Sequence, residues 1–381
     1  MIYHDLGRSG LKASCVGLGC EYLVDKSFSE VDRVIGTAVD GDINILDVFM
    51  PQPEVRDNIG RALEGRREKV LLQGHICTVC EDGQYARTRD LKRTKAYFED
   101  FYTRYRTDYV DIGMIHFVDS PEEVHVVLEE GVMDYARSLK KAGRVRTLGV
   151  SSHNPVTARM MVETGLVDVL MFSINPAYDM LPKDVNSDDM FKSETYESDN
   201  FRGLDPERAK LYATCEALGV GITVMKPLAG GAMISPSRTP FDRVMTVPQL
   251  IHYALSKPAV ASVLVGCANE AEVKEALRYL EAPKDELEDL SVLAESPKYS
   301  MSGKCMYCNH CQPCPSGIDI AAVTKYTDLY EYTKAPTVLE HYRALEKHAS
   351  DCIQCGQCEP RCPFAVRVRE NMIKAQGMFR D

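Results

Sequence analysis

Two runs of cysteine near the C-terminus are the most restrictive feature of this 381-residue chain. In each run, three cysteines stand with two residues between neighbours, and a fourth cysteine is followed directly by proline. The runs are Cys305, Cys308, Cys311 and Cys314, and then Cys352, Cys355, Cys358 and Cys362. Thiolates at this spacing are typical ligands of cubane [4Fe–4S] clusters, because iron bound to sulfide prefers sulfur donors.

The pairing of ligands follows two-cluster ferredoxins, in which the fourth cysteine of each run binds the cluster of the other run. The resulting sets are Cys305, Cys308, Cys311 and Cys362 for one cluster, and Cys352, Cys355, Cys358 and Cys314 for the other. Zinc sites and disulfides are the alternatives, but zinc motifs usually come as separated cysteine pairs, and disulfides need an oxidising compartment. We predict two [4Fe–4S] clusters and therefore a redox role for this part of the chain.

Composition restricts the partners and the compartment. The net charge is −11 and no basic run stands out, so we expect neither nucleic acid nor an anionic membrane as a partner. The sequence has no apolar run of membrane-spanning length and no apolar signal core at its start. Its 14 cysteines are then expected to stay reduced, which favours a cytoplasmic protein.

Residues 1–283 alternate between short apolar runs rich in β-branched residues and amphipathic helical stretches. Strands are predicted at Ala13–Gly19, Ile43–Phe49, Val70–Ile76, Tyr109–His116, Arg146–Ser151, Val167–Ile174, Gly221–Lys226 and Ala261–Val265. Helices are predicted at Ser29–Val39, Glu54–Leu63, Leu91–Arg104, Glu122–Ala142, Thr157–Thr164, Pro206–Leu218, Val247–Leu255 and Ala271–Leu280. Because parallel strands need crossover helices, the pattern indicates the α/β class and a (β/α)8 TIM barrel.

Three further segments complete the predicted organisation. The opening YHDLGRSGLKAS forms a short hairpin, turning at Ser9-Gly10, that caps the bottom of the barrel. The polar, acidic segment 179–204 follows the sixth strand and is either a mobile lid or a surface ornament. Residues 284–381 form the second domain, with a connector helix and a small α-helical ferredoxin-like fold around the cysteine runs.

Polar side chains collect where four neighbouring strands end. These residues are Asp47, His75, His116, and the group Ser151, Ser152 and His153. In a (β/α)8 barrel, the C-terminal strand ends and the loops that follow carry the chemistry. A carboxylate and three imidazoles on one rim therefore indicate a functional site, and the alternative is that each histidine satisfies local hydrogen bonds.

Several stretches in this order resemble the aldo/keto reductase family, in the branch that carries a C-terminal ferredoxin-like domain. They are LGRSGLKASCVGLG, GDINILDV followed by NIGRAL, DYVDIGMIH, GVSSH, VMKPLAGG and LVGCANEAEV. The resemblance covers nearly the whole chain. It implies a barrel that binds a nicotinamide cofactor across its mouth and acts on a small carbonyl or alcohol.

The family works with an Asp, Tyr, Lys and His tetrad, and this chain departs from it. Asp47 and His116 match the aspartate and the histidine, whereas Gln52 and His75 stand at the tyrosine and lysine positions. Glutamine cannot act as a general acid, but histidine can, because its pKa lies near neutrality. We predict His75 and His116 as the acid–base pair with Asp47 as orienting group. His75 itself, Tyr22 or Tyr85 could replace the missing proton donor.

The same resemblance implies a dinucleotide site along the rim. The matching positions are Ser151, Ser152, Asn175, Lys226, Leu228, Gly230, Gly266, Asn269 and Glu272. Members that prefer NADP carry an arginine at the position of Glu272. Since a carboxylate repels a 2′-phosphate and can accept from a ribose hydroxyl, NAD(H) is expected over NADP(H) if a dinucleotide binds.

One loop holds further candidates. Cys77 and Cys80 form a CTVC motif, read here as two reduced packing cysteines, with a redox dithiol or a metal pair as the alternative. Arg87 and Arg89 either clamp a substrate carboxylate or lie on a solvated surface.

Three functions fit these features. The leading one is an oxidoreductase that couples two-electron chemistry at the barrel mouth to single-electron transfer through the clusters, with a ferredoxin- or flavodoxin-type carrier as partner. The second is a metal- or acid/base-dependent enzyme for elimination or isomerisation, which uses Asp47, His75, His116 and His153 without hydride transfer. The third is a non-catalytic electron-transfer or redox-sensing module on a barrel that has lost two tetrad positions.

Overall fold

The computed structural model describes residues 1–197, 201, 203–295, 301 and 303–380. These residues pack as two compact units. The first unit comprises 1–174, 220–227 and 260–280, and the second comprises 175–219, 228–259 and 281–381. The units follow packing and not chain order, so a domain boundary after residue 283 stays a prediction.

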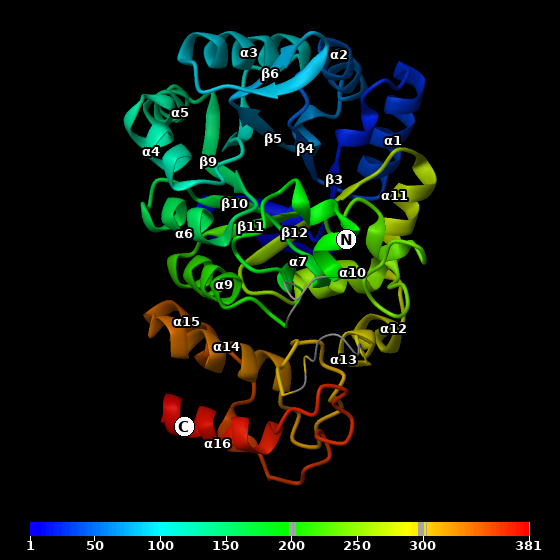
Figure 1. Ribbon diagram of the computed structural model, residues 1–381, viewed down its shortest axis with the longest axis vertical. Coiled ribbons are helices and arrows are strands. Elements are labelled where there is room, and N and C mark those ends of the chain that lie inside the picture. The colour runs from blue at the N-terminus through cyan, green and yellow to red at the C-terminus, as the bar shows by residue number, and fades with distance from the viewer. Residues whose placement is uncertain (198–200, 202, 296–300, 302, 381) are drawn as a thin grey trace. The chain divides into compact units, whose positions relative to one another are not determined.

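The first unit contains a closed barrel of eight parallel strands, counted over the described residues (Figure 1). They are β3 Val16–Gly19, β4 Ile45–Val48, β5 Leu71–Ile76, β8 Val110–Ile115, β9 Val145–Ser152, β10 Val169–Ser173, β11 Gly221–Met225 and β12 Val260–Gly266. Each strand pairs with the next, and β12 closes the ring on β3. The predicted (β/α)8 barrel is therefore confirmed.

Helices separate the strands along the chain. In the first unit they are α1 Phe28–Asp40, α2 Pro53–Ala62, α3 Leu91–Arg104, α4 Pro121–Glu129, α5 Val132–Lys141, α6 Pro155–Glu163 and α11 Glu270–Leu277. The prediction of one long helix at Glu122–Ala142 is wrong. Gly131 has φ +90°, a left-handed conformation that an α-helix cannot contain, so α4 and α5 are separate helices.

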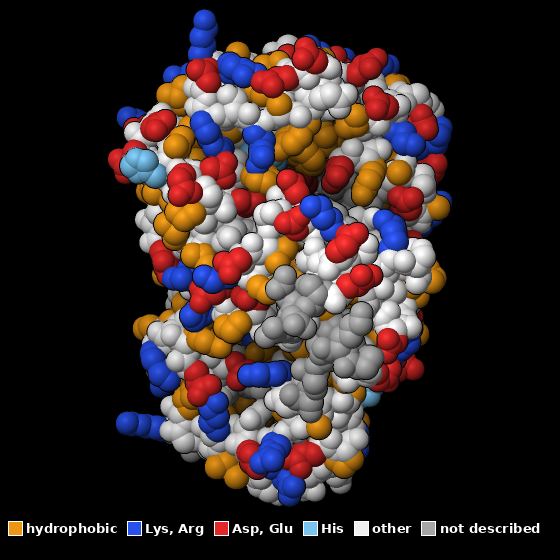
Figure 2. All heavy atoms as spheres, viewed as in Figure 1, with side chains coloured by type: hydrophobic (Ala, Val, Ile, Leu, Met, Phe, Trp, Pro, Cys, Tyr) orange, Lys and Arg blue, Asp and Glu red, His pale blue; other side chains and the backbone are white. Residues whose placement is uncertain are grey.

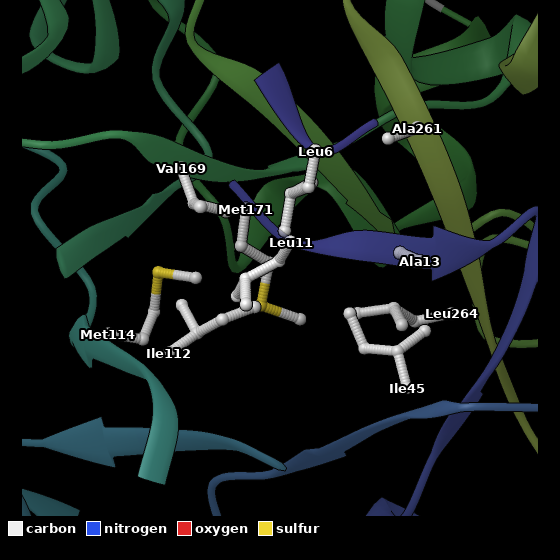
Figure 3. Packing of buried hydrophobic residues seen from close by; sticks show 10 residues of the cluster. All are labelled: Leu6, Leu11, Ala13, Ile45, Ile112, Met114, Val169, Met171, Ala261 and Leu264. Atoms are coloured by element: carbon white, nitrogen blue, oxygen red, sulfur yellow. The ribbon is translucent and has the colours of Figure 1, made fainter. Parts of the chain in front are cut away.

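The N-terminal hairpin pairs β1 Tyr3–Asp5 with β2 Lys12–Ser14. Its turn places Leu6 and Leu11 in the buried cluster drawn in Figure 3, beside Val169 and Ala261 near the starts of their strands. The hairpin therefore caps the bottom of the barrel, as predicted. The expected strand Ala13–Gly19 is divided, because its first residues belong to this hairpin and the barrel strand begins at Val16.

A second hairpin, between β5 and α3, was not predicted. It pairs β6 Thr78–Glu81 with β7 Gln84–Arg87 across Asp82 and Gly83. Both turn residues have positive φ, +49° and +79°, as a two-residue hairpin turn requires. The Asp-Gly dipeptide is a common hairpin signal, and this hairpin carries Tyr85.

The second unit is helical. Its helices are α7 Pro176–Asp179, α8 Ser193–Glu197, α9 Pro206–Leu218, α10 Val247–Leu255, α12 Lys284–Glu288, α13 Val292–Glu295, α14 Ile320–Thr333, α15 Pro336–Arg343 and α16 Val368–Phe379. The single connector helix expected after residue 284 is two short helices, α12 and α13. The segment 179–204 contains α8, while residues 198–200 and 202 of the predicted lid lie outside the described part.

Within this unit, α9 packs against the helices that follow the first cysteine run. Ala213 of α9 lies in a buried cluster with Leu329 of α14 and Val338 of α15. His341 Nδ1 lies 2.7 Å from Glu216 Oε1, and Thr337 donates to the carbonyl of Ala217. The helical domain predicted around the cysteines therefore has an apolar core that it shares with α9.

The surface mixes charges of both signs, as the visible face in Figure 2 shows. Among the described residues, no helix combines the length and the apolar character that crossing a membrane requires.

Candidate active site

The ends of β4, β5 and β8 bring three predicted residues into one hydrogen-bonded chain. His75 Nε2 lies 2.8 Å from Asp47 Oδ1, and His75 Nδ1 lies 2.6 Å from His116 Nδ1. The register of the parallel strands explains this, because Asp47 pairs with Gln73, two residues before His75 on the same face of β5. All three side chains are buried.

The unpredicted hairpin adds Tyr85 to this chain. Its hydroxyl lies 2.5 Å from His116 Nε2. Since β6 begins two residues after β5 ends, the hairpin is anchored at the strand that carries His75. Tyr85 is 36% exposed, so its end of the chain faces solvent. Of the two tyrosines proposed as donors from sequence, Tyr85 is therefore the one that the structure joins to His116.

The carboxylate of Asp47, at one end of this chain of bonds, determines where the protons lie. An ionised Asp47 accepts hydrogen bonds, so His75 donates from Nε2 and its Nδ1 accepts from His116 Nδ1. His116 Nε2 is then left to accept from the Tyr85 hydroxyl. This series of bonds, named here the relay, is continuous from Tyr85 to Asp47 with both imidazoles neutral.

The surroundings favour the neutral state of His116. Burial lowers the pKa of His116 well below its usual value of 6.5, and neighbouring His75 lowers it further. Burial also raises the pKa of Tyr85 to about 12, so its phenol stays protonated at neutral pH. The Phe49 ring stacks on His116, with centroids 5.7 Å apart, and meets Tyr85 edge-on at 5.5 Å.

Gln73 holds the inner end of the relay and was missed from the sequence. Its Nε2 donates to Asp47 Oδ1 at 2.7 Å, and its Oε1 accepts from Thr223 at 3.0 Å. Gln73 is fully buried inside the barrel. The signal was available, because an amide within the apolar strand LLQGHI needs buried partners.

A second polar chain begins at the end of β9. His153 Nδ1 lies 2.9 Å from Asp119 Oδ2, and Lys226 Nζ lies 2.9 Å from His153 Nε2. Burial acts to raise the pKa of Asp119, but hydrogen bonds from His153 and Ser152 outweigh it and lower that pKa. Asp119 therefore stays ionised and fixes His153 with Nε2 as the acceptor from Lys226.

The two arginines of the hairpin loop have different environments. Arg89 donates to the carbonyls of His116 and Phe117 at 2.9 and 2.7 Å and so braces the loop after β8. The Arg87 guanidinium lies 3.7 Å from the centroid of the Phe117 ring. Arg89 is committed to the backbone, which disfavours the prediction that it clamps a substrate.

Cys77 does not have the character of a reactive thiol. It is buried, and burial raises its pKa, although Arg89 and Thr94 act in the opposite direction. Cys80 lies in β6 opposite Tyr85. A raised pKa disfavours a thiolate at Cys77, in keeping with its interpretation as an unreactive, reduced cysteine.

In the second unit, the eight cysteines of the two runs line two separate cavities. One is lined by Cys305, Cys308, Cys311 and Cys362, and the other by Cys314, Cys352, Cys355 and Cys358. These sets are the ones expected from the exchange of fourth ligands. Apolar side chains, among them Ile320 and Val368, line both cavities. Four thiols in an apolar pocket are the donor set that a [4Fe–4S] cluster requires.

The two CxxCxxC loops have left-handed residues at the same two positions. Tyr307 and Gln354, at matching positions, have φ +56° and +55°, and Asn309 and Gly356 have φ +63° and +74°. Left-handed residues between the cysteines turn the loop so that successive thiols line one cavity. Asparagine tolerates this conformation better than most residues do, which explains how the first run replaces a glycine.

Comparison with known proteins agrees with this organisation. The model of the aldo/keto reductase family matches residues 18–249, and that of a 4Fe-4S dicluster domain matches residues 300–367. This chain belongs to the aldo/keto reductase family. It is an oxidoreductase of that type with an appended 4Fe-4S dicluster domain.

The similar proteins cover between about half and three quarters of this chain. YqkF of Bacillus subtilis, described as an uncharacterized oxidoreductase, is 26% identical over 323 residues, covering 77% of this chain and 95% of that protein. The aldo-keto reductase YhdN of Bacillus subtilis is 23% identical over 197 residues, 49% of this chain and 56% of that protein. The fold resembles the holo form of aldo-keto reductase AKR11C1 from Bacillus halodurans, with a TM-score of 0.57 and 20% identity, over 75% of this chain and 94% of that chain.

The two positions that depart from the expected tetrad lie in different settings. Gln52 precedes α2, and its Oε1 is buried without a hydrogen-bond partner among the described residues. His75 lies inside the relay. Tyr22 instead packs by Gly266, where an added Cβ would come within 2.7 Å of its ring.

Most of the predicted cofactor side chains in the first unit make local hydrogen bonds. Ser151 Oγ accepts from the Phe117 amide, and Ser152 Oγ donates to Asp119. At the start of α11, Asn269 Oδ1 accepts from the Glu272 amide. The Glu272 carboxylate accepts from the Ala268 amide at 2.7 Å and from the Asn269 amide group at 2.9 Å. A carboxylate therefore already occupies the N-terminus of this helix.

The other predicted rim residues belong to the second unit. Asn175 is buried and caps α7 by accepting from the Tyr178 amide. Leu228 precedes Ala229, Gly230 and Gly231, all in the left-handed region with φ of +49°, +62° and +82°. The amides of Gly231 and Met233 donate to the Leu228 carbonyl, which closes this loop on itself.

Proposed function

We propose that this oxidoreductase couples the two-electron conversion of a small carbonyl or alcohol at the barrel mouth to single-electron transfer through two [4Fe–4S] clusters, with NAD(H) as the dinucleotide. The observation that carries the proposal is the relay, which joins Tyr85 at the solvent side to buried Asp47 through two neutral imidazoles. Proton transfer to or from an oxygen accompanies every carbonyl–alcohol conversion.

In this proposal the resting relay acts as a base, which the inferred direction of its hydrogen bonds supports. Tyr85 accepts the proton of a substrate hydroxyl at its oxygen and passes its own proton to His116 Nε2. His116 passes its Nδ1 proton to His75 Nδ1, and His75 passes its Nε2 proton to Asp47. The relay then has Asp47 protonated and every bond reversed, and from that state Tyr85 returns a proton to a carbonyl oxygen.

Lys226 supplies the positive charge beside this site. It donates to His153, which Asp119 orients, so the ammonium group is held in place by a fixed partner. Its backbone φ of +57° is unusual for lysine, and such residues are concentrated at functional sites. Lys226 stabilises negative charge on a substrate oxygen or carboxylate as the proton moves.

The cluster ligands are the two sets of four cysteines that line separate cavities. Bound there, the clusters would transfer electrons one at a time, whereas a dinucleotide or a carbonyl exchanges two together. The chain's own contribution is the two cysteine loops and the apolar side chains, among them Ile320 and Val368, that line both cavities. A ferredoxin- or flavodoxin-type protein is the carrier that we expect outside the cavities.

The preference for NAD(H) rests on Glu272. Its carboxylate already accepts from the Ala268 backbone amide and the Asn269 side-chain amide just before α11, so a 2′-phosphate there meets a like charge. Replacing this glutamate by glutamine removes the charge and keeps one acceptor oxygen. The Glu272→Gln variant should therefore lose discrimination against NADPH.

An anaerobic titration tests the proposal. Cluster-loaded protein is mixed with NADH or NADPH while the visible absorbance of the clusters is followed. We expect bleaching by NADH, little bleaching by NADPH, and a smaller difference between them in Glu272→Gln. Absence of bleaching by either, in protein with about eight irons per chain, contradicts the coupling to a dinucleotide.

A second candidate is elimination or isomerisation by proton transfer alone, because the relay completes a proton transfer without any dinucleotide. It predicts exchange of substrate C–H for solvent deuterium in the absence of NAD. A metal version is less favoured, since both ring nitrogens of His75 and of His116 already have hydrogen-bond partners.

A further inference from the structure

One lysine of the second unit is buried beside the first cysteine run. Lys257 follows the end of α10 and is 4% exposed. Its Nζ lies 3.8 Å from the centroid of the Tyr253 ring and 6.0 Å from that of the Tyr307 ring. Lysine is rarely buried to this degree without a compensating negative charge.

The turn that carries Lys257 contacts the cysteine loop directly. Tyr307 stands between Cys305 and Cys308 in the chain, and Ser256, the neighbour of Lys257, donates from Oγ to the Met306 carbonyl at 3.4 Å. Burial lowers the pKa of Lys257, while Asp179 and the thiols of Cys305 and Cys308 favour its charged form. The two tyrosine rings also stabilise the ammonium ion, through cation–π contacts.

The acidic groups around this lysine already have partners. Asp179 accepts from Arg208, from the Tyr212 hydroxyl at 2.6 Å and from the Tyr253 hydroxyl at 2.7 Å. The Tyr307 hydroxyl donates to Asp328 at 2.8 Å. A cluster with four thiolates in the adjacent cavity carries net negative charge, so it is suited to be the counter-ion of Lys257.

The other cavity has a different electrostatic setting. Cys355 is exposed there, and the neighbouring Ile353 is 67% exposed. The basic side chain on its lining, Arg369, is about half exposed and is paired with Glu359 at 2.8 Å. Solvent screens an exposed, neutralised pair, whereas a buried charge acts through a low dielectric.

We propose that Lys257 is a positioning charge that raises the reduction potential of the cluster held by Cys305, Cys308, Cys311 and Cys362 above that of the other cluster. Adding one electron makes a cluster more negative, so a buried cation stabilises the reduced form. Electrons that enter through the exposed cluster then move toward the cluster beside Lys257. This inference rests on the cluster assignment of the proposed function and not on the dinucleotide.

Potentiometry followed by electron paramagnetic resonance tests it, with dithionite as the source of single electrons. The Lys257→Met and Lys257→Gln variants should shift the midpoint of one cluster to more negative potential and leave the other unchanged, whereas Lys257→Arg should keep the original value. Lys304→Met is the matched control, because it removes an exposed lysine next to Cys305 and should shift neither midpoint. A Cys355→Ser background identifies the exposed cluster by its altered signal.

The outcomes separate this inference from the proposed function. Unchanged midpoints in Lys257→Met or Lys257→Gln, with full cluster content, contradict the inference, and so does an equal shift of both clusters. Lack of a [4Fe–4S] signal in the unmodified protein contradicts the cluster assignment itself. Failure of NADH to bleach the clusters affects only the dinucleotide coupling, since dithionite still reports the midpoints.

Discussion

The barrel mouth and the two cysteine cavities differ in what holds their reactive groups in place. At the barrel mouth, strand register places Asp47 and His75, and hydrogen bonds to protein atoms join every member of the relay. In the cavities, the thiols stand on loops with left-handed non-glycine residues such as Tyr307 and Gln354. A site fixed by hydrogen bonds is preorganised without a cofactor, whereas loops around a cluster depend on the metal for their shape.

The largest effect should follow from removal of iron. Chelation, or the Cys308→Ser/Cys311→Ser variant, should strongly increase hydrogen exchange in α14 and α16 and leave the barrel strands protected. The reason is that ligand bonds hold the strained cysteine loops, on which Ile320 and Val368 also pack. Cys80→Ser is the control, since this cysteine lies in β6. Equal loss of protection in both units would show that the two sites are not independent.

Interruption of the relay should be the next largest effect. The Tyr85→Phe and His116→Gln variants should each lower kcat for a small aldehyde such as glyceraldehyde by about 10²–10⁴-fold, the usual contribution of a positioned acid–base group. Their double variant should lose little more, because both act in one chain of bonds. Tyr22→Phe should retain activity. Multiplicative losses in the double variant would argue against a single relay.

The close contact between α2 and the end of α3 should not tolerate one added methyl group. A Cβ at Gly60 in α2 would lie 2.1 Å from the carbonyl oxygen of Arg104, so Gly60→Ala should lower the free energy of unfolding by at least ~1–3 kcal/mol. Gly377 in α16 has open space around it, and Gly377→Ala should stabilise its helix by up to ~1 kcal/mol. Chemical denaturation measures both. Similar values for the two variants would contradict the close helix contact at Gly60.

The smallest effect concerns the packing of α15 on α9. The hydrogen bond to Glu216 raises the pKa of His341. The pair of charged His341 and Glu216 therefore stabilises the fold fully below the usual histidine pKa of ~6.5. This stabilisation is lost as pH rises through the raised pKa. Because His341 is partly exposed, we expect the pair to add less than about 1 kcal/mol to the free energy of unfolding. As His341 loses its proton, hydrogen exchange in α15 should increase by more than the intrinsic pH dependence of exchange. This extra increase should be absent in the His341→Gln variant.

The sequence was sufficient for the barrel and for the residues at its strand ends. Strand ends of a parallel barrel share one rim, so Asp47, His75 and His116 could be placed together without coordinates. The direction of the bonds could not be predicted, because it depends on ring orientations that Gln73 and Phe49 help to fix. Tyr85 was a candidate, but its link to His116 depends on a hairpin that was read as a loop despite Asp82 and Gly83.

The helical unit was less predictable in its details. Helical patterns identified α14 and α15, and the cysteine spacing predicted the two sets of four cysteines that line separate cavities. The role of Lys257 was not visible, because the residue is distant in sequence from both runs and its burial arises from packing of α10. In the first unit, the break at Gly131 was also missed, since good helix formers flank it on both sides.

Nitrogen-15 NMR of histidine-labelled protein tests the relay most directly, with His75→Gln and His116→Gln used to assign the signals. The account predicts that His75 carries its proton on Nε2 and His116 on Nδ1, and that His116 stays neutral as pH falls through 6.5, because burial lowers its pKa. A His116 protonated on Nε2, or titrating near 6.5, would contradict a neutral relay that runs from Tyr85 to Asp47.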